Sequence, residues 1–261
     1  MADLALTFDG LRAEIGYFLG YGRDPDGWTS DQENNLNACV HAGYRQFLTP
    51  PPGGGRRASY QWTFLRPNLD VGLVADVRDY LLPAGFQWFE GDLSLVTSSY
   101  VYAPVKRRGV GELEQLRSQA GGSFTGTPYY AAVRPKSMEG GAGTGQRMEL
   151  MLYPTPNTSY TLRGQAQMNP PALSKANPYP YGGPAHAETL KQSCLAAAER
   201  DIDDAPQGGH MAAFMQCLAA SIDADCRLRP SNLGYAGDGE RHVIDPNSVA
   251  QATWNGTLYE G

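Results

Sequence analysis

Four side chains that could ligate a divalent cation lie close together between two predicted helices. They are Asp201, Asp203, Asp204 and His210. Carboxylate oxygens and an imidazole nitrogen can together hold such an ion. Their spacing matches no known metal-binding loop, and a polar loop between two helices has the same composition. We therefore predict an interhelical loop here, with a metal-dependent hydrolase that uses this cluster as an alternative.

A glycine-rich run at residues 139–145 resembles a phosphate-binding loop only in its composition. Such a loop needs Lys and Ser or Thr directly after its last glycine, at the start of a helix. Here Gln146 and Arg147 follow instead and open a predicted strand. The run is therefore predicted to be a hairpin.

The candidate nucleophiles and acid–base pairs are also incomplete. Ser193 and Ser221 fall inside predicted helices, and the chain has no G-x-S-x-G nucleophile elbow. Glu90 and Asp92 share one face of a predicted strand, but single carboxylate pairs are common by chance. The sequence thus predicts a structural protein without enzymatic activity, and with no catalytic residue, cofactor or metal.

The composition is that of a globular chain with many turns. Of its 261 residues 41% are apolar and 18% charged, and 31 glycines and 19 prolines exceed average usage. This composition favours β-structure with ordered loops over a purely helical fold. The sequence contains no apolar run of about 18 residues, so we predict no membrane span.

The charge balance argues against binding to a nucleic acid backbone. The net charge is −6 and the sequence pI is about 5.2, whereas phosphate contacts need clustered Lys and Arg. One short basic run exists, at residues 106–108, and we predict a solvated loop or strand end there.

The four cysteines are Cys39, Cys194, Cys217 and Cys226. They lack C-x-x-C spacing, so no zinc site is predicted, and most have apolar neighbours, as expected for small buried hydrophobes. No signal peptide is recognised. We expect a protein made and folded in a reducing cytoplasm.

Helical periodicity appears near both ends of the chain. In the second predicted helix Ser30 and Glu33 form an S-x-x-E capping box, in which each side chain satisfies an otherwise unpaired backbone N–H. Several alanines in the last two helices would allow close helix packing. The predicted helices cover residues 11–19, 30–49, 185–203 and 209–227, with a short one at 112–119.

Between these ends the apolar period changes from 3.6 to 2. Tyr60, Trp62 and Phe64 alternate with polar residues, which predicts a half-buried strand whose aromatic face lies in the core of a β-sandwich. The strands at 148–153 and 160–167 flank a Pro-Thr-Pro-Asn turn and are expected to pair as a hairpin. Further strands are predicted at 71–77, 80–82, 86–96, 100–106 and 129–133.

The predicted fold is α+β: a β-sandwich or open barrel with an α-helical bundle made from N-terminal and C-terminal helices. The predicted organisation has four parts. They are an N-terminal helical pair (1–52), a β-sandwich domain (53–184), C-terminal helices packing with the N-terminal pair (185–229) and an extended docking tail (230–261).

This arrangement resembles the head-to-tail adaptor (connector or neck) proteins of tailed bacteriophages, including tail-tubular adaptors. The likeness covers about residues 11–227, except for an insert at 109–127. It is carried by the helix pairs, the Pro-rich connector 169–184 and three motifs. These are Tyr60-Gln-Trp62-Thr-Phe64-Leu65, Tyr80-Leu-Leu-Pro83-Ala-Gly-Phe86 and Pro154-x-Pro156-x3-Tyr160-x-Leu162.

The resemblance implies a structural virion protein, assembled in the host cytoplasm and located at the head–tail neck. Such proteins form a homo-oligomeric ring, usually a dodecamer, between the portal protein and the tail or a nozzle or stopper protein. The ring would form part of the DNA exit channel, through which double-stranded DNA passes without specific binding. An acidic chain suits that role because it avoids phosphate contacts.

The final segment, 230–261, lacks periodicity but carries the aromatic and apolar residues Trp254, Leu258 and Tyr259. We expect these three residues to bind a partner, since aromatic anchors are favoured at interfaces. A neighbouring subunit or the portal would own the pocket, although docking on its own domain is an alternative. The alternative function is a β-sandwich ligand- or glycan-binding module of a virion or cell surface, which should present a groove lined by exposed aromatics.

Overall fold

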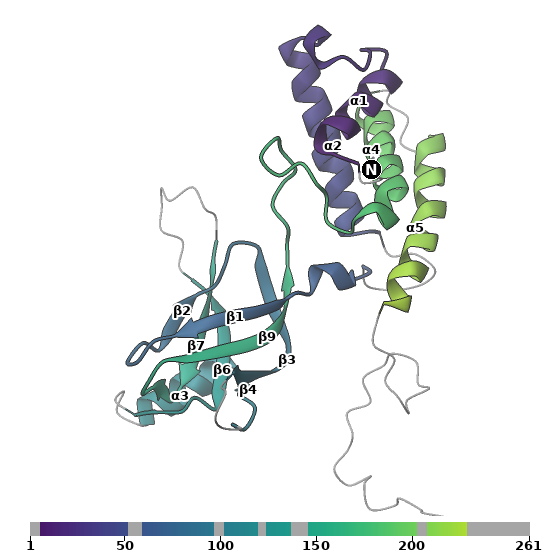
Figure 1. The fold of residues 1–261 in the computed structure, drawn as a ribbon. Coiled ribbons are helices and arrows are strands. Elements are labelled where there is room, and N and C mark those ends of the chain that lie inside the picture. The colour runs from purple at the N-terminus through teal and green to yellow at the C-terminus, as the bar shows by residue number, and fades with distance from the viewer. Residues whose placement is uncertain are drawn as a thin grey trace, which may run out of the picture. The chain divides into compact units, whose positions relative to one another are not determined.

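The computed structural model describes residues 6–51, 59–96, 102–119, 124–136, 146–202 and 208–228. All of these belong to one unit, residues 1–228, and the remaining 229–261 form a second unit. The described part contains four longer helices in one group and a set of strands in another (Figure 1). The prediction of an α+β fold with a bundle of N-terminal and C-terminal helices is confirmed.

The helical bundle consists of α1 (Phe8–Phe18), α2 (Ser30–Leu48), α4 (Ala187–Asp201) and α5 (Gly209–Arg227). Helix α4 packs against each of the other three. Its contact with α2 depends on Gly43, because a Cβ atom there would lie 2.4 Å from the Cα of Cys194. Ser193 strengthens this contact by donating a 2.8 Å hydrogen bond to the Gly43 carbonyl.

The capping box of α2 lies one residue earlier than predicted. The Thr29 hydroxyl accepts from the Gln32 backbone N–H at 3.3 Å, and the Gln32 side chain accepts from the Thr29 N–H at 2.9 Å. Glu33, the predicted partner of Ser30, instead lies 2.9 Å from the buried guanidinium of Arg12 in α1. The sequence fits the S/T-x-x-E/Q pattern in both registers, and the long-range ion pair accounts for the use of Glu33 elsewhere.

Tyr60, Trp62 and Phe64 do not form a strand, and they do not lie in the sandwich core. Trp62 directly precedes a short 3-10 helix, η2 (Thr63–Leu65), and its ring is fully buried in the core of the helical bundle. The indole N–H donates to the Phe47 carbonyl at 2.9 Å. The prediction was wrong because alternating aromatics mark any extended segment with one buried side, whatever element covers it.

Seven of the described strands form two sheets that share one hydrophobic core, and two very short strands pair separately as a third sheet. The first has the antiparallel order β1-β9-β3, and the second has the order β2-β7-β6-β4. The two are joined at one edge by an antiparallel bridge between Leu93 and Val105. The strands are β1 (Asn68–Leu73), β2 (Asp79–Leu81), β3 (Phe86–Val96), β4 (Lys106–Arg107), β6 (Tyr130–Pro135), β7 (Met148–Tyr153) and β9 (Tyr160–Met168).

Strands β7 and β9 do not pair as the predicted hairpin. Strand β7 lies between β2 and β6 in the four-stranded sheet, whereas β9 lies between β1 and β3 in the other sheet. The connection passes through β8 (Thr155–Pro156), which pairs with β5 (Thr125–Gly126). Turn residues indicate where the chain bends, but they do not indicate which strands pair. Both β7 and β9 are central strands, and their backbone hydrogen bonds could be made with several other strands.

Strand β1, Asn68–Leu73, lies earlier in the chain than the predicted strand at 71–77. It ends at Leu73, after which the Tyr80 hydroxyl lies within hydrogen-bonding distance of the carbonyls of Val74 and Val77, at 2.9 and 2.7 Å, and can donate to either. These bonds fold the segment back toward β2. Burial raises the pKa of the Tyr80 hydroxyl, so it stays a neutral donor.

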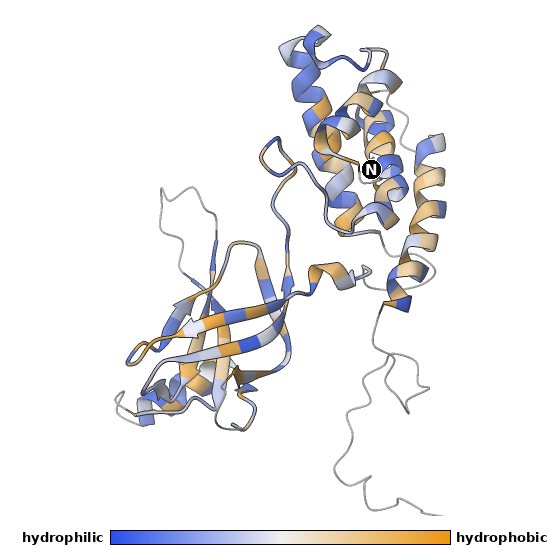
Figure 2. Ribbon diagram, viewed as in Figure 1, coloured by the Kyte–Doolittle hydropathy of each residue, from blue (hydrophilic) through white to orange (hydrophobic). Residues whose placement is uncertain are grey.

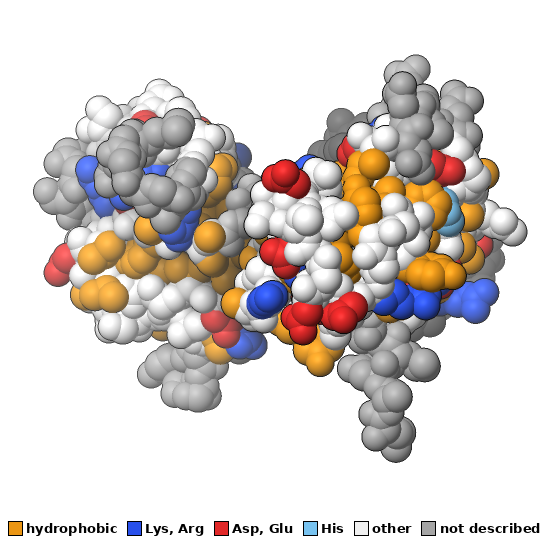
Figure 3. Space-filling model, turned by 90° about the horizontal axis from the view of Figure 1, so that it is seen from above, with side chains coloured by type: hydrophobic (Ala, Val, Ile, Leu, Met, Phe, Trp, Pro, Cys, Tyr) orange, Lys and Arg blue, Asp and Glu red, His pale blue; other side chains and the backbone are white. Residues whose placement is uncertain are grey.

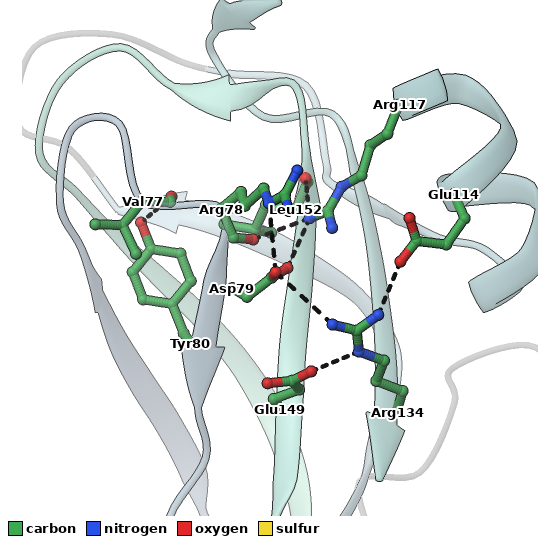
Figure 4. A network of polar contacts seen from close by, with 9 residues as sticks. All are labelled: Val77, Arg78, Asp79, Tyr80, Glu114, Arg117, Arg134, Glu149 and Leu152. Carbon is green, nitrogen blue, oxygen red and sulfur yellow. Dashed lines mark hydrogen bonds and ion pairs between the residues drawn. The ribbon is translucent and has the colours of Figure 1, made fainter. Parts of the chain in front are cut away.

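Helix α3 (Val110–Gln119) is held on the four-stranded sheet by a buried arginine (Figure 4). Arg117 donates to the carbonyls of Arg78 and Leu152 at 3.1 and 2.9 Å, and lies 2.8 Å from the Asp79 carboxylate. Arg134 of β6 extends the network to Asp79, Glu149 and Glu114. Leu113, Ala132 and Met151 are packed together in a small apolar cluster under the helix.

The burial of Trp62 gives a direct test of the corrected packing. Trp62→Ala should lower the free energy of unfolding by about 3–5 kcal/mol, because it empties the bundle core and leaves the Phe47 carbonyl without its donor. Thermal or urea unfolding measures the change. Trp88→Ala is the matched control, since Trp88 is 38% exposed on β3 and should cost far less. Equal losses for the two variants would contradict the burial of Trp62 in the core.

Candidate functional site

The predicted cation cluster is only partly within the described residues, and the described members have other partners. Asp201 pairs with the neighbouring Arg200 at 2.7 Å. The His210 ring nitrogen lies 2.9 Å from the Gln192 side-chain oxygen, and the ring packs edge-on against Phe18. Asp203 and Asp204 lie outside the described residues. Across the described part, no group of three or more His, Cys, Asp or Glu side chains is arranged to hold a metal.

Sequence inspection missed Glu199, which caps the start of α5. Its two carboxylate oxygens accept from the backbone N–H groups of Gly209 and His210 at 3.1 and 3.0 Å. A negative charge at this position also interacts favourably with the helix dipole. One acidic residue near this interhelical region, Glu199 of α4, therefore serves as a cap for α5. No local pattern reveals this cap, because the two partners are ten residues apart.

The serines and carboxylates considered for catalysis serve in packing. Ser193 bonds Gly43 as described above, and the Ser221 hydroxyl lies 2.6 Å from that of Thr189, which joins α5 to α4. Glu90 forms an ion pair with Arg66 at 3.3 Å, while Asp92 accepts from the Arg107 N–H at 3.4 Å. The two carboxylates thus have separate partners, and β3 is irregular between Glu90 and Ser94.

All four cysteines are free thiols. Cys39 and Cys194 are buried where α2 meets α4, and burial raises the pKa of Cys39 to about 11 and that of Cys194 further. Both are therefore un-ionised at neutral pH and serve as small apolar side chains. Cys217 is half-buried and Cys226 is exposed on α5.

The basic run at 106–108 is a solvated strand end, as predicted. Lys106 and Arg107 form β4, and all three side chains belong to exposed residues. The Arg107 guanidinium donates to the Phe89 carbonyl of β3. Arg108 lies over the Tyr130 ring at 4.9 Å and pairs with Glu112 at 3.5 Å.

The segment at 59–65 leads from the bundle to the sheets. A buried polar centre holds this segment against the last helix, α5. The Asp225 carboxylate of α5 is fully buried and accepts from the Tyr60 hydroxyl at 2.7 Å and from the Thr63 N–H at 3.1 Å. The Thr63 hydroxyl donates to the same carboxylate. His186 lies in the neighbouring aromatic cluster, with its ring centre 5.1 Å from that of Trp62. These residues connect η2, η3 (Pro184–His186) and α5.

An apolar stripe runs along the exposed side of α5. We call it the α5 outer face, and its members are Ala212, Met215, Ala219, Ile222 and Cys226. Their spacing places them on one side of the helix. All are exposed except Ile222, which is half-buried, and Met215 has 38% of its surface accessible.

The colouring in Figure 2 shows orange and pale residues along most of α5. On the face drawn in Figure 3, apolar side chains gather in patches instead of being scattered singly. Contiguous exposed apolar surface is typical of an interaction site. The α5 outer face is therefore the candidate functional site of the described bundle. The predicted partner-binding residues Trp254, Leu258 and Tyr259 lie outside the described residues.

His186 should make the stability of this region depend on pH. Its side chain is 4% exposed, and burial lowers its pKa below the ordinary value, an effect that the charge of Asp225 partly offsets. In the unfolded chain the histidine takes up a proton at about pH 6.5. In the folded protein His186 is protonated only at lower pH, because its pKa is lowered. The free energy of unfolding should therefore decrease as pH falls below about 6.5.

Replacement of the imidazole tests this. His186→Gln should flatten the dependence of unfolding free energy on pH between 7 and 5, measured by urea unfolding at several pH values. The NMR titration of the His186 ring in the unsubstituted protein should give a midpoint below 6.5. An unchanged slope in the variant together with an ordinary ring titration would contradict the assignment.

Comparisons with known proteins leave the site to be interpreted from its own geometry. A scan against protein-family models finds no family that matches the chain, and a search of curated proteins finds no similar sequence. Among the described residues, no helix is both long enough and apolar enough to cross a membrane.

Proposed function

We propose that the chain is a structural subunit of a phage head–tail adaptor ring, in which the α5 outer face contacts a neighbouring copy. The observation that carries this proposal is the unbroken apolar stripe on α5. Its small side chains, Ala212 and Ala219 beside Met215, permit close approach of another element. A ring built from identical head-to-tail contacts needs such a surface on every subunit.

The polar chemistry of the described residues also suits a scaffold. The serines and carboxylates considered above are engaged in helix packing, capping and ion pairs, and Cys39 and Cys194 are buried as thiols. A net charge of −6 agrees with a channel wall that does not retain DNA through its phosphates. In this proposal the ring binds the portal protein on one side and the tail, nozzle or stopper protein on the other.

A charge placed on the α5 outer face should prevent assembly without unfolding the subunit. Met215→Glu should give a folded monomer, because burying an unpaired carboxylate in a subunit contact is costly while an exposed substitution changes stability by only about 0.5 kcal/mol. Native mass spectrometry and light scattering, alone and with portal protein, measure the assembly. Ala220→Glu is the control, since Ala220 is also exposed and lies about 140° around the helix from Met215, away from the α5 outer face.

The assembly measurement also separates the two proposed functions. A ring that resists Met215→Glu would show that α5 is not the contact. If the unsubstituted protein stays monomeric with portal present, the adaptor proposal fails and the glycan-binding alternative gains. That alternative is favoured by one feature of the β-part, the exposed aromatics Phe124 and Tyr129, which both pack against Tyr153.

The segment 230–261 is proposed as a docking arm that uses Trp254, Leu258 and Tyr259. Deleting residues 245–261 should leave the melting temperature nearly unchanged, since the two described cores lie upstream. The same deletion should weaken or abolish attachment of the ring to the portal, measured by co-sedimentation. The triple variant Trp254→Ala, Leu258→Ala, Tyr259→Ala is the finer test and should reproduce the deletion. Unfolding of the truncated protein would assign the segment to its own core, and full portal binding would exclude a docking arm.

A further inference from the structure

The two sheets are joined at one edge by a very short strand that lies between β3 and β6. On one side Val105 and Leu93 exchange two backbone hydrogen bonds, of 3.0 and 2.7 Å. On the other side the Lys106 N–H donates to Tyr129 and the Arg108 N–H to Ala131, at 2.9 and 2.8 Å. After Arg108 the chain leaves this position and enters α3 at Val110. A longer β4 would continue between β3 and β6, but the chain leaves that position after Arg108.

The strand edges beyond β4 face this vacated place. In the β6–β7 ladder, Ala131 and Val133 lie opposite Leu152 and Leu150. The Leu152 N–H bonds Arg78 on the far side, and the Ala131 carbonyl bonds Arg108 on the near side. Because residues two apart in a strand point their backbone groups the same way, the N–H and C=O of Val133 point toward the vacated place. No described residue outside the strands bonds them there.

The opposite edge has the same character. Phe89 lies opposite Ala166 of β9, whose N–H donates to Pro67 on the far side, so the backbone groups of Phe89 point outward. The Phe89 carbonyl accepts from the Arg107 guanidinium, a side chain standing where a neighbouring strand would supply an N–H. Since Val105 to Arg108 bonds both edges, these edges are held two strand spacings apart, about 9–10 Å, which is room for one extended chain.

A cavity of about 240 Å³ occupies this position. Trp88 and Phe89 line it from β3, Ala131 and Val133 line it from β6, and Arg107 and Arg108 lie beside the end of β4. It is smaller than the roughly 300–1,000 Å³ of sites that bury a whole small-molecule ligand. Its size and its two strand edges fit a few side chains of an extended peptide better than a compact ligand.

We propose that this cleft binds an extended peptide segment of a partner protein, which adds as a strand between β3 and β6 and places an acidic side chain against Arg107 and Arg108. Strand addition at exposed sheet edges obtains affinity from main-chain hydrogen bonds and specificity from pockets for alternate side chains. The acidic preference follows from the charge at the closed end of the cleft. Arg108 is 41% exposed there, with one ion pair to Glu112 at 3.5 Å. The inference does not depend on ring assembly.

Synthetic peptides test the inference on the full chain. The probes are blocked, fluorescein-labelled Glu-Val-Thr-Val-Thr-Val, the same peptide with Glu in the last position, and the version with Lys in place of Glu. At least one Glu peptide should bind about tenfold more tightly than the Lys peptide by fluorescence anisotropy. Hydrogen exchange at the Val133 amide should slow when it binds. The better Glu position gives the direction of the added strand.

Matched variants assign the binding to the cleft. Arg108→Gln should remove most of the preference for Glu, whereas Arg163→Gln should not, because Arg163 is similarly exposed but lies on β9 in an ion pair with Asp70. The proposal is overturned if no Glu peptide is preferred, or if binding leaves Val133 exchange unchanged. It is also overturned if Trp88→Ala abolishes self-association of the protein, which would make a second copy the occupant, or if an oligosaccharide displaces the peptide.

Discussion

The buried carboxylate of Asp225 is the interaction on which the closure of the helical bundle depends. The chain leaves the bundle after Leu65 and returns to it at Leu173, more than a hundred residues later. Asp225 binds the departing segment through Tyr60 and Thr63, so the last helix and the segment at 59–65 fix each other. A carboxylate in this place must have all of its donors, since a buried charge without partners is costly. The aromatic ring of Trp62 is thereby held in the bundle core, against Phe47.

Elements whose pattern is strong within the element itself were predictable from the sequence. The bounds of β3, β7 and α5 agree with the predicted ranges, because each combines a clear apolar period with glycine or proline at one end at least. Choices between partners were not predictable in this way. The register of the α2 cap was decided by Arg12, and the neighbours of β7 and β9 by the sheet in which each lies. Such decisions depend on contacts between residues far apart in the chain.

The candidate site was predictable to a smaller degree. The apolar side of α5 was visible in its sequence, but the sequence could not distinguish which part of that side meets α4 and which part stays uncovered. Met215 and Leu218 are both apolar and lie three residues apart on the helix, yet Leu218 is buried and Met215 is not. The cleft beside β4 left no sequence signal at all. It results from the early departure of the chain into α3, and its lining comes from four separate strands, β3, β4, β6 and β7.

Arg117 has a consequence for how this fold can vary among related chains. The helix that carries it lies in a segment, 109–127, that would look dispensable by its position between two strands. Yet the guanidinium satisfies two backbone carbonyls and the carboxylate of Asp79, and the helix shields Met151. Loss of this segment would expose Met151 and leave Asp79 with only Arg78 and Arg134 as ion-pair partners among the described residues. This segment and the residues that face it on β2 and β7 should therefore change together.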